Sequence, residues 1–263
     1  MKQASSFFLI AGPCVVESAR LLDTVASHAK EVCARLGIPL VFKASYDKAN
    51  RTRVDSFRGL ERQKALELLA AVRARHGVPV LTDVHESADC PTAAAYVDWL
   101  QIPSFLSRQT DLLLAAGRTG KGVNIKKGQF LAPEAVRFAL EKVRGTGNHQ
   151  VWITERGTTF GYHDLVVDMT GIPRMRAFGA PVVVDCTHSV QKPNQSGGVT
   201  GGDRELIGTI ALAALAAGAD GLFLEVHPEP ARAACDADSQ LPLAELEPLL
   251  RKGLRVWNAA RSE

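Results

Sequence analysis

The chain has 263 residues, 46% of them hydrophobic, which is enough for a large core and within the usual size of a single α/β barrel domain. The 22% of charged residues are dispersed along the chain, and this pattern excludes a disordered protein. The net charge is only +3 and no dense basic run occurs, so we expect no nucleic-acid partner.

The first apolar run, 7–11, predicts a strand rather than a signal peptide, because it continues into "GPCVVES" without a small-residue cleavage site. No stretch approaches the roughly 20 apolar residues of a membrane span. The five cysteines are scattered and odd in number, which is typical of a reducing compartment. We therefore expect a soluble cytoplasmic protein that binds no membrane.

Short β-rich runs alternate with helical patterns along the whole chain. The predicted strands are 7–11, 39–45, 78–84, 96–102, 122–127, 150–156, 181–187 and 221–227. Helical spacing of apolar residues predicts helices over 18–36, ended by Gly37, over 204–218 and over 243–260. Continuous apolar strands between helices indicate a parallel sheet, and eight such units predict a single-domain (β/α)8 TIM barrel over 1–263. An open doubly wound sheet is the alternative, but no G-x-G-x-x-G follows the first strand.

Unusual polar residues stand at the carboxyl end of every predicted strand, where the chemistry of an α/β barrel belongs. At a single position such a residue is common on a solvated rim, but eight strands showing it together predict a site. In chain order they are Cys14, Lys43 with Lys48, Asp83 with His85, Gln101, Lys126, Arg156, His188 and Glu225.

One group of these residues is cationic, and it predicts anionic ligands, because so many positive charges around one mouth would otherwise repel each other. Its size favours two phosphorylated substrates over one. In "NIKK", alternation lets only one of the two lysines point into the barrel, and the pattern leaves that choice open. The group comprises Lys43, Lys48, Arg51, Arg108, Lys126 and Arg156.

A second, separate group has the donors of a metal site. The first strand of a closed barrel lies beside the eighth, and the eighth beside the seventh, so Cys14, His188 and Glu225 should meet. The loop after the last strand adds Asp236, and such a mixed set suits a divalent transition ion. From the residues alone, Cys14 could instead be a packing thiol or half of a disulfide. Cys235 and His227 stay open as substitute ligands.

The motifs resemble those of the 3-deoxy-D-manno-octulosonate 8-phosphate (Kdo8P) synthase family, metal-dependent branch. They are "GPCVVES", "FKASYDKANRTR", "TDVHE", "QIPSFLSRQTDLL", "VNIKKGQF", "TERGTTFGYHDLVVDM", "VVVDCTHSVQ" and "FLEVHPEP" with "CDADSQLPL". They cover most of the chain in order. The "DKANR" stretch separates this family from its sister family, which uses erythrose 4-phosphate and has a "KPRT"-type segment there.

The resemblance implies condensation of phosphoenolpyruvate with D-arabinose 5-phosphate, a step towards Kdo for lipopolysaccharide, in a homotetramer. The metal-dependent branch has cysteine where the other has asparagine, and that position is Cys14. The resemblance therefore implies one divalent transition metal ion per subunit (Zn, Fe, Mn or Co). The ligands carried over are Cys14, His188, Glu225 and Asp236.

The same resemblance assigns the remaining residues. Lys126 and Arg156 would hold the phosphate of phosphoenolpyruvate, and Lys43, Lys48 and Gln101 would surround its carboxylate end. Asp83 and His85 would contact sugar hydroxyls or transfer protons. The residues expected to bind arabinose 5-phosphate are Asn50, Arg51, Thr52, Ser104 and, from a neighbouring subunit, Arg108. The loop 192–204 is expected to close over the site.

Two other functions stay open at this point. One is a DAHP synthase-type condensation with erythrose 4-phosphate. The other is a barrel that binds sugar phosphates without turning them over, which would not need a metal set.

Overall fold

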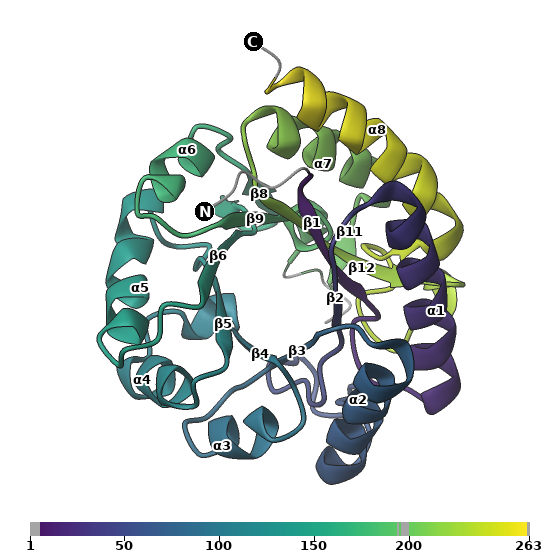
Figure 1. Cartoon of the computed structure of the whole chain (residues 1–263), viewed down its shortest axis with the longest axis vertical. Helices are drawn as coiled ribbons and strands as arrows, with labels where there is room; N and C mark the ends of the chain where they lie inside the picture. The colour runs from purple at the N-terminus through teal and green to yellow at the C-terminus, as the bar shows by residue number, and fades with distance from the viewer. Residues whose placement is uncertain (1–5, 194, 196–199, 262–263) are drawn as a thin grey trace.

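The computed structural model describes residues 6–193, 195 and 200–261. Eight parallel strands form a closed barrel in which β1 pairs with both β2 and β12, and the helices stand outside it (Figure 1). The predicted (β/α)8 barrel is therefore confirmed. The barrel strands are β1 (Phe8–Gly12), β2 (Leu40–Lys43), β3 (Val80–Asp83), β4 (Trp99–Ile102), β5 (Gly122–Lys126), β6 (Val151–Glu155), β9 (Val182–Asp185) and β12 (Gly221–His227).

Helices cover the outside of the barrel, and the first and last of them, α1 and α8, lie side by side (Figure 1). Their bounds are α1 (Ala19–Leu36), α2 (Arg62–His76), α3 (Asp89–Ala94), α4 (Thr110–Arg118), α5 (Val136–Arg144), α6 (Gly171–Arg176), α7 (Ile207–Ala216) and α8 (Leu246–Ala259). In α1 the Ser18 side chain accepts a hydrogen bond from the backbone N of Leu21, and Gly37 ends the helix at φ 66°. None of the described helices is long and apolar enough to cross a membrane.

The amino-terminal half of the barrel interior is filled by apolar side chains. Trp99 and Trp152 stack with ring centroids 3.4 Å apart, and Phe8 lies 4.6 Å from Trp152. Gly122 leaves room for this layer, because a Cβ there would overlap the Trp99 ring. A second layer lies above it and consists of Ile10, Val41, Leu81, Val183 and Phe223. Because strand residues alternate between the two faces, the next inward positions fall at the carboxyl ends of the strands.

Most strands are shorter than predicted. The run 39–45, for example, contains only Leu40–Lys43 as strand, since the residues after it leave the ladder. Three short pairings were not predicted: β7 (Thr158–Phe160) with β8 (Asp164–Val166), β10 (Gln191–Lys192) with β11 (Gly201–Gly202), and β13 (Leu241–Pro242) with β12. Both ends of the loop 192–204 are thereby joined, and its residues 194 and 196–199 lie outside the described residues.

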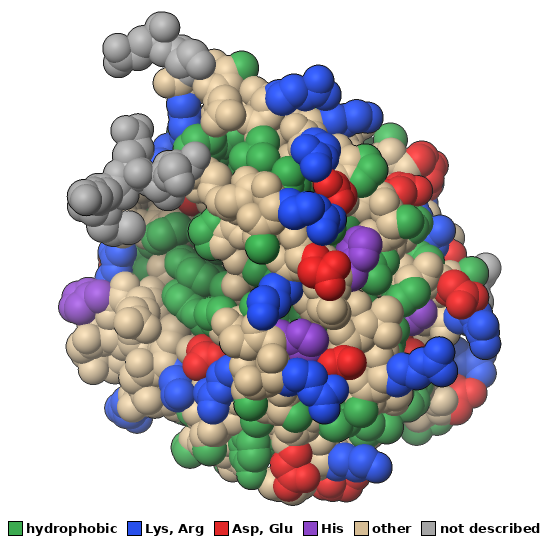
Figure 2. Space-filling model, turned by 45° about the vertical axis from the view of Figure 1, so that its right-hand side comes forward, with side chains coloured by type: hydrophobic (Ala, Val, Ile, Leu, Met, Phe, Trp, Pro, Cys, Tyr) green, Lys and Arg blue, Asp and Glu red, His purple; other side chains and the backbone are tan. Residues whose placement is uncertain are grey.

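On the molecular face drawn in Figure 2, basic and acidic side chains are interspersed, with hydrophobic side chains between them. Several large hydrophobic side chains on the surface are more than half exposed, among them Phe105, Phe130, Phe138 and Phe160.

Candidate active site

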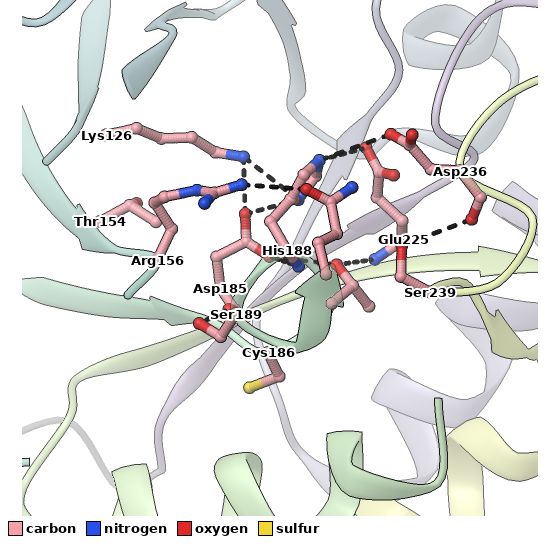
Figure 3. Close-up of polar contacts among 12 residues, drawn as sticks. Lys126, Thr154, Arg156, Asp185, Cys186, His188, Ser189, Glu225, Asp236 and Ser239 are labelled. Atoms are coloured by element: carbon pink, nitrogen blue, oxygen red, sulfur yellow. Dashed lines mark hydrogen bonds and ion pairs between the residues drawn. The ribbon is translucent and has the colours of Figure 1, made fainter. Parts of the chain in front are cut away.

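Polar side chains fill the carboxyl-terminal end of the barrel, as the sequence predicts. The strands bring them there by alternation, for example Phe8, Ile10 and Gly12 on β1 or Phe223 and Glu225 on β12. Almost all are buried: Lys43, Asp83, Gln101, Asn124, Lys126, Thr154, Asp185 and Glu225. We call this set the barrel mouth. Figure 3 shows its part around His188.

Four barrel-mouth side chains on β3 to β6 form a hydrogen-bonded chain. Gln101 Nε2 donates to Asp83 Oδ1 at 2.6 Å, and Asn124 Nδ2 donates to Gln101 Oε1 at 2.8 Å. Thr154 Oγ1 then donates to Asn124 Oδ1 at 2.7 Å. Each buried polar atom in this chain has a partner, so the chain fixes the wall of the mouth.

Lys43 is a buried residue of the barrel mouth and neutralises two carboxylates. Its Nζ lies 2.8 Å from Glu225 Oε1 and 3.7 Å from Asp83 Oδ2, and it also donates to the Cys14 carbonyl at 3.2 Å. Burial lowers the pKa of Lys43, but Glu225 and Asp83 raise it more, so the pKa lies above its ordinary value. Lys43 is therefore a fixed cation.

Of the two adjacent lysines, Lys126 points into the barrel. Its Nζ lies 2.6 Å from Asp185 Oδ2 and 4.2 Å from the centre of the Phe223 ring. Lys127 is fully buried on the other side, where it donates to the carbonyls of Gly128 and Leu131. The structure thus decides the choice that alternation left open.

The cationic residues and the potential metal ligands lie together at one mouth. Lys43 pairs with Glu225 and Lys126 pairs with Asp185, so positive and negative groups alternate around one mouth. The sequence order could not show this, because the partners come from strands far apart in the chain. The repulsion that seemed to require ligands is already relieved by carboxylates.

Lys48 and Arg156 are less completely paired. Lys48 Nζ lies 3.9 Å from Glu225 Oε1, and burial together with Lys43 lowers its pKa. Arg156 is buried and donates to Gln191 Oε1 at 3.0 Å, and within the described part of the chain it forms no ion pair. Burial lowers the Arg156 pKa, yet an arginine stays charged. These two side chains are free to meet an anionic ligand.

His188, Glu225 and Asp236 form a group with metal-binding geometry. His188 Nε2 lies 3.7 Å from Glu225 Oε1 and 3.9 Å from Asp236 Oδ2 (Figure 3). Each residue offers one donor atom, and the three atoms lie within 4.8 Å of one another. Glu225 Oε2 is buried without a hydrogen-bond partner among the described residues, which is costly for a carboxylate oxygen unless a ligand takes it. The set fits a divalent transition ion.

The expectation of a free Cys14 thiolate is not met, because Cys14 forms a disulfide with Cys235. The bond joins the end of β1 to the loop after β12, and Cys14 Sγ lies 3.4 Å from Asp236 Oδ2. Cys14, Cys235 and Asp236 form a second group of potential ligands that shares Asp236 with the first. The odd cysteine count had suggested five thiols, whereas the described structure has three free ones, all buried: Cys33, Cys90 and Cys186.

Asp83 and His85, both expected at the site, differ in their charge. Asp83 accepts hydrogen bonds from Ser45 Oγ and Gln101 Nε2. Burial raises its pKa, but Lys43, Lys48 and Lys126 outweigh that effect and hold the pKa well below its ordinary value. Burial lowers the pKa of His85, whose Nδ1 is buried without a partner among the described residues. Asp83 is therefore a fixed carboxylate and His85 a neutral imidazole.

The residues expected to bind the sugar phosphate lie at the rim. Asn50 and Thr52 are exposed in the loop after β2, and Arg51 is half-buried with an unpartnered Nε in the described structure. Asp47 anchors this loop by accepting hydrogen bonds from Arg58 and Arg62. Beyond β4, Ser104 is buried while Arg108 is exposed. Within the described residues, we find no hydrogen bond or ion pair that joins these rim residues to the barrel mouth.

Comparison with known proteins identifies the family of this chain. Residues 3–259 match the model of the DAHP synthetase I family. The chain belongs to this family. It is 52% identical to a 2-dehydro-3-deoxyphosphooctonate aldolase of Syntrophobacter fumaroxidans over 97% of this chain and 88% of the relative. Proteins of the same name in Granulibacter bethesdensis and Fusobacterium nucleatum are 52% and 50% identical, over 94% and 95% of this chain and 87% and 90% of theirs.

Four residues of the site were not predicted from the sequence. Asn124 and Thr154 complete the hydrogen-bonded wall, Gln191 holds Arg156, and Asp185 holds both Lys126 and His188. A usable signal existed for Asn124, Thr154 and Asp185, since each is a polar residue at an inward position of a buried strand. Gln191 lies in the short strand β10, outside the barrel strands, and carried no such signal.

Proposed function

We propose that this protein condenses phosphoenolpyruvate with D-arabinose 5-phosphate and water, giving 3-deoxy-D-manno-octulosonate 8-phosphate and inorganic phosphate. The aldolase name of its relatives, which match nearly the whole chain, supports this activity. The observation that carries the proposal is one barrel mouth that combines incompletely paired cations, Lys48 and Arg156, with the His188 group. Cations suit two anionic substrates, and the His188 group suits the chemistry at an aldehyde or a water.

The atoms balance as follows. C3 of phosphoenolpyruvate forms a bond to C1 of the sugar aldehyde, and the aldehyde oxygen takes up a proton and becomes a hydroxyl. The oxygen of water adds to C2, the bond between C2 and the phosphate oxygen breaks, and a keto group remains. The two protons of the water go to the new hydroxyl and to the departing phosphate.

We assign the phosphate of phosphoenolpyruvate to Arg156 and Lys126, and its carboxylate end to Lys48, Lys43 and Gln101. Asn50, Arg51, Thr52 and Ser104 are our candidates for the sugar phosphate. Because Asp83 is a fixed carboxylate, we assign the movement of protons to His85, whose imidazole is neutral. Asp83 instead keeps Lys43 and Gln101 in place.

We further propose that the mouth holds one divalent transition ion through His188, Glu225 and Asp236, joined by the Cys14 thiolate when the disulfide is reduced. The unpartnered Glu225 Oε2 and the donor set support this. When bound, such an ion supplies Lewis acidity towards an aldehyde oxygen or a water. A reducing, cytoplasmic location would keep Cys14 and Cys235 as thiols.

A homotetramer is the quaternary structure that we propose. Arg108 is exposed and lies next in the chain to a segment that includes Phe105, whose ring is 54% exposed. Exposed apolar rings suit burial against another copy of the chain, which would bring Arg108 towards a neighbour's rim.

The activity is tested by phosphate release. We expect release only when phosphoenolpyruvate and arabinose 5-phosphate are both present, measured with a colorimetric phosphate assay on the reduced protein supplied with Mn²⁺ or Zn²⁺. Phosphoenolpyruvate alone is the control for simple hydrolysis. Faster release with erythrose 4-phosphate would replace this proposal by the DAHP reaction, and binding without release would favour a sugar-phosphate-binding barrel.

Replacing Arg156 by alanine should weaken phosphoenolpyruvate binding while the fold persists. A charge-assisted hydrogen bond is worth about 1.5–3 kcal/mol, or roughly ten- to a hundredfold in affinity. Titration calorimetry with phosphoenolpyruvate measures the effect. Arg118→Ala, which removes an exposed arginine from α4, is the matched control and should bind like the parent. Equal affinities of the Arg156 variant and the parent would remove Arg156 from the site.

A further inference from the structure

Asp185 is a buried carboxylate at the end of β9 with a partner for every side-chain oxygen. Oδ2 lies 2.6 Å from Lys126 Nζ and 2.7 Å from His188 Nδ1. Oδ1 accepts hydrogen bonds from the backbone N of His188 at 2.9 Å and from Thr187 Oγ1 at 3.0 Å. Its exposed fraction is 0%, and Figure 3 shows it between Lys126 and His188. One carboxylate thus contacts two barrel-mouth groups to which we assign different ligands.

The contact with His188 determines which ring nitrogen is free. Nδ1–H donates a hydrogen bond to Asp185 Oδ2, so Nε2 faces Glu225 and Asp236 at 3.7 and 3.9 Å. A carboxylate behind a histidine is the arrangement that fixes the ring and raises its basicity as a metal ligand. The second bond, from the His188 backbone N, holds the residue's main chain at the same carboxylate.

The contact with Lys126 gives a buried ammonium group its ion-pair partner and holds it in place. Lys126 is 6% exposed, and its Nζ lies over the Phe223 ring and 3.5 Å from His188 Nδ1. Asp185 is the ion-pair partner that the described structure gives Lys126, and a buried cation that loses its partner is strongly unfavourable. We therefore expect Lys126 to leave its position when Asp185 is replaced.

We propose that Asp185 is a positioning residue that orients both the metal-binding nitrogen of His188 and the phosphate-binding Nζ of Lys126. It touches neither ligand itself and acts through these two side chains. The inference rests on the proposed function, which assigns the metal ion to His188 and the phosphate to Lys126. Its consequence is that a single neutralising substitution at Asp185 should weaken two binding sites at once.

The test is Asp185→Asn, measured by equilibrium binding rather than by turnover. Asparagine keeps the size but offers an NH2 group to Lys126 or His188, which both need an acceptor. We expect Co²⁺ affinity, measured in competition with a chromophoric chelator under reducing conditions, to fall about ten- to a hundredfold. The visible absorption of bound Co²⁺ should change, and phosphoenolpyruvate binding in calorimetry should weaken.

Glu155→Gln is the matched control. Glu155 is also a buried carboxylate at a strand end, but it accepts the backbone N–H groups of Arg156 and Gly157 and faces Lys127 at 3.5 Å. We expect this variant to bind Co²⁺ like the parent with an unchanged spectrum. If Asp185→Asn does not fold, Asp185→Glu keeps the charge, moves the oxygens by one methylene, and should weaken both ligands in the same direction.

The outcomes are separable. An Asp185 variant that binds Co²⁺ and phosphoenolpyruvate like the parent overturns this inference alone, and so does an equal loss of Co²⁺ affinity in Glu155→Gln. A reduced parent protein that binds no Co²⁺ overturns the proposed metal site and this inference with it. Weaker binding of both ligands in Asp185→Asn, with intact Co²⁺ binding in Glu155→Gln, supports the inference.

Discussion

Lys43→Met should unfold more easily than the parent by about 3–5 kcal/mol, because it leaves two buried carboxylates without their shared cation. Glu225 is 1% exposed and loses its 2.8 Å partner, and Asp83 loses a cation at 3.7 Å. Methionine fills most of the volume, so the loss of stability comes from charge rather than from a cavity. Urea unfolding followed by circular dichroism measures it, and activity should fall as well.

Two comparisons isolate the cause. Arg35→Met removes a surface pair, Arg35 with Glu247, whose arginine side chain is 51% exposed, and should change stability by less than about 1 kcal/mol. Adding Glu225→Gln to Lys43→Met should restore part of the lost stability, since one unpaired charge disappears with it. A Lys43→Met protein as stable as the parent would show that the pair contributes nothing.

The same pair has a pH dependence with a definite sign. Burial raises the pKa of Glu225, but Lys43, His188 and Lys48 lower it more, to about 2. The pKa in the folded protein is thus below the unfolded value, so the stabilisation is present above pH 4.5 and is lost as the pH falls towards 2. In Lys43→Met the largest cause that lowers the Glu225 pKa is gone, so protonation of Glu225 relieves the buried charge, and the stability gap between variant and parent should narrow as the pH falls. Urea unfolding of both proteins at a series of pH values measures the gap.

Metal binding should depend on the oxidation state of Cys14 and Cys235. Oxidation joins two thiols into one disulfide and releases two protons and two electrons to an oxidant such as a peroxide. In the disulfide, Cys14 has no thiolate to offer, and a soft thiolate contributes strongly to holding a transition ion. We expect metal content, measured by elemental analysis after dialysis, to rise with reductant, and phosphate release to rise with it.

Single-cysteine variants determine which sulfur binds. Cys14→Ala should bind metal weakly with or without reductant, whereas Cys235→Ala leaves Cys14 free and should bind metal in both conditions. Cys186→Ala, at a free buried cysteine, is the control and should behave like the parent. The opposite result for the first two variants would make Cys235 the ligand. Parent-like metal content in both would end the thiolate assignment.

The fold was largely predictable because it depends on local pattern. β12 lies where the apolar run 221–227 predicts it, and Gly37 ends α1 as expected. The ends of the other strands were not predictable. Ser45, beyond the end of β2, forms only an isolated bridge with Val15, while its side chain donates to Asp83 on the neighbouring strand. A contact of this kind depends on a partner 38 positions away in the sequence, which no local window contains.

The site was predictable in its members but not in its pairings. Strand ends identified Lys43, Lys126 and Glu225, because inward polar residues in a buried strand are rare. Which carboxylate neutralises which lysine depends on barrel closure and on side-chain reach, so the pairing of Lys126 with Asp185 was hidden. The Cys14–Cys235 bond was hidden for the same reason, since 221 residues separate its two ends.

An aromatic layer fills the amino-terminal half of the barrel interior, so the site is reached from the carboxyl-terminal end. Trp99, Trp152 and Phe8 pack against each other in this layer, and Phe223 forms the floor beneath Lys126. Substrates and products must therefore enter and leave through the carboxyl-terminal end of the barrel, where the loop that carries Asn50 and Arg51 lies.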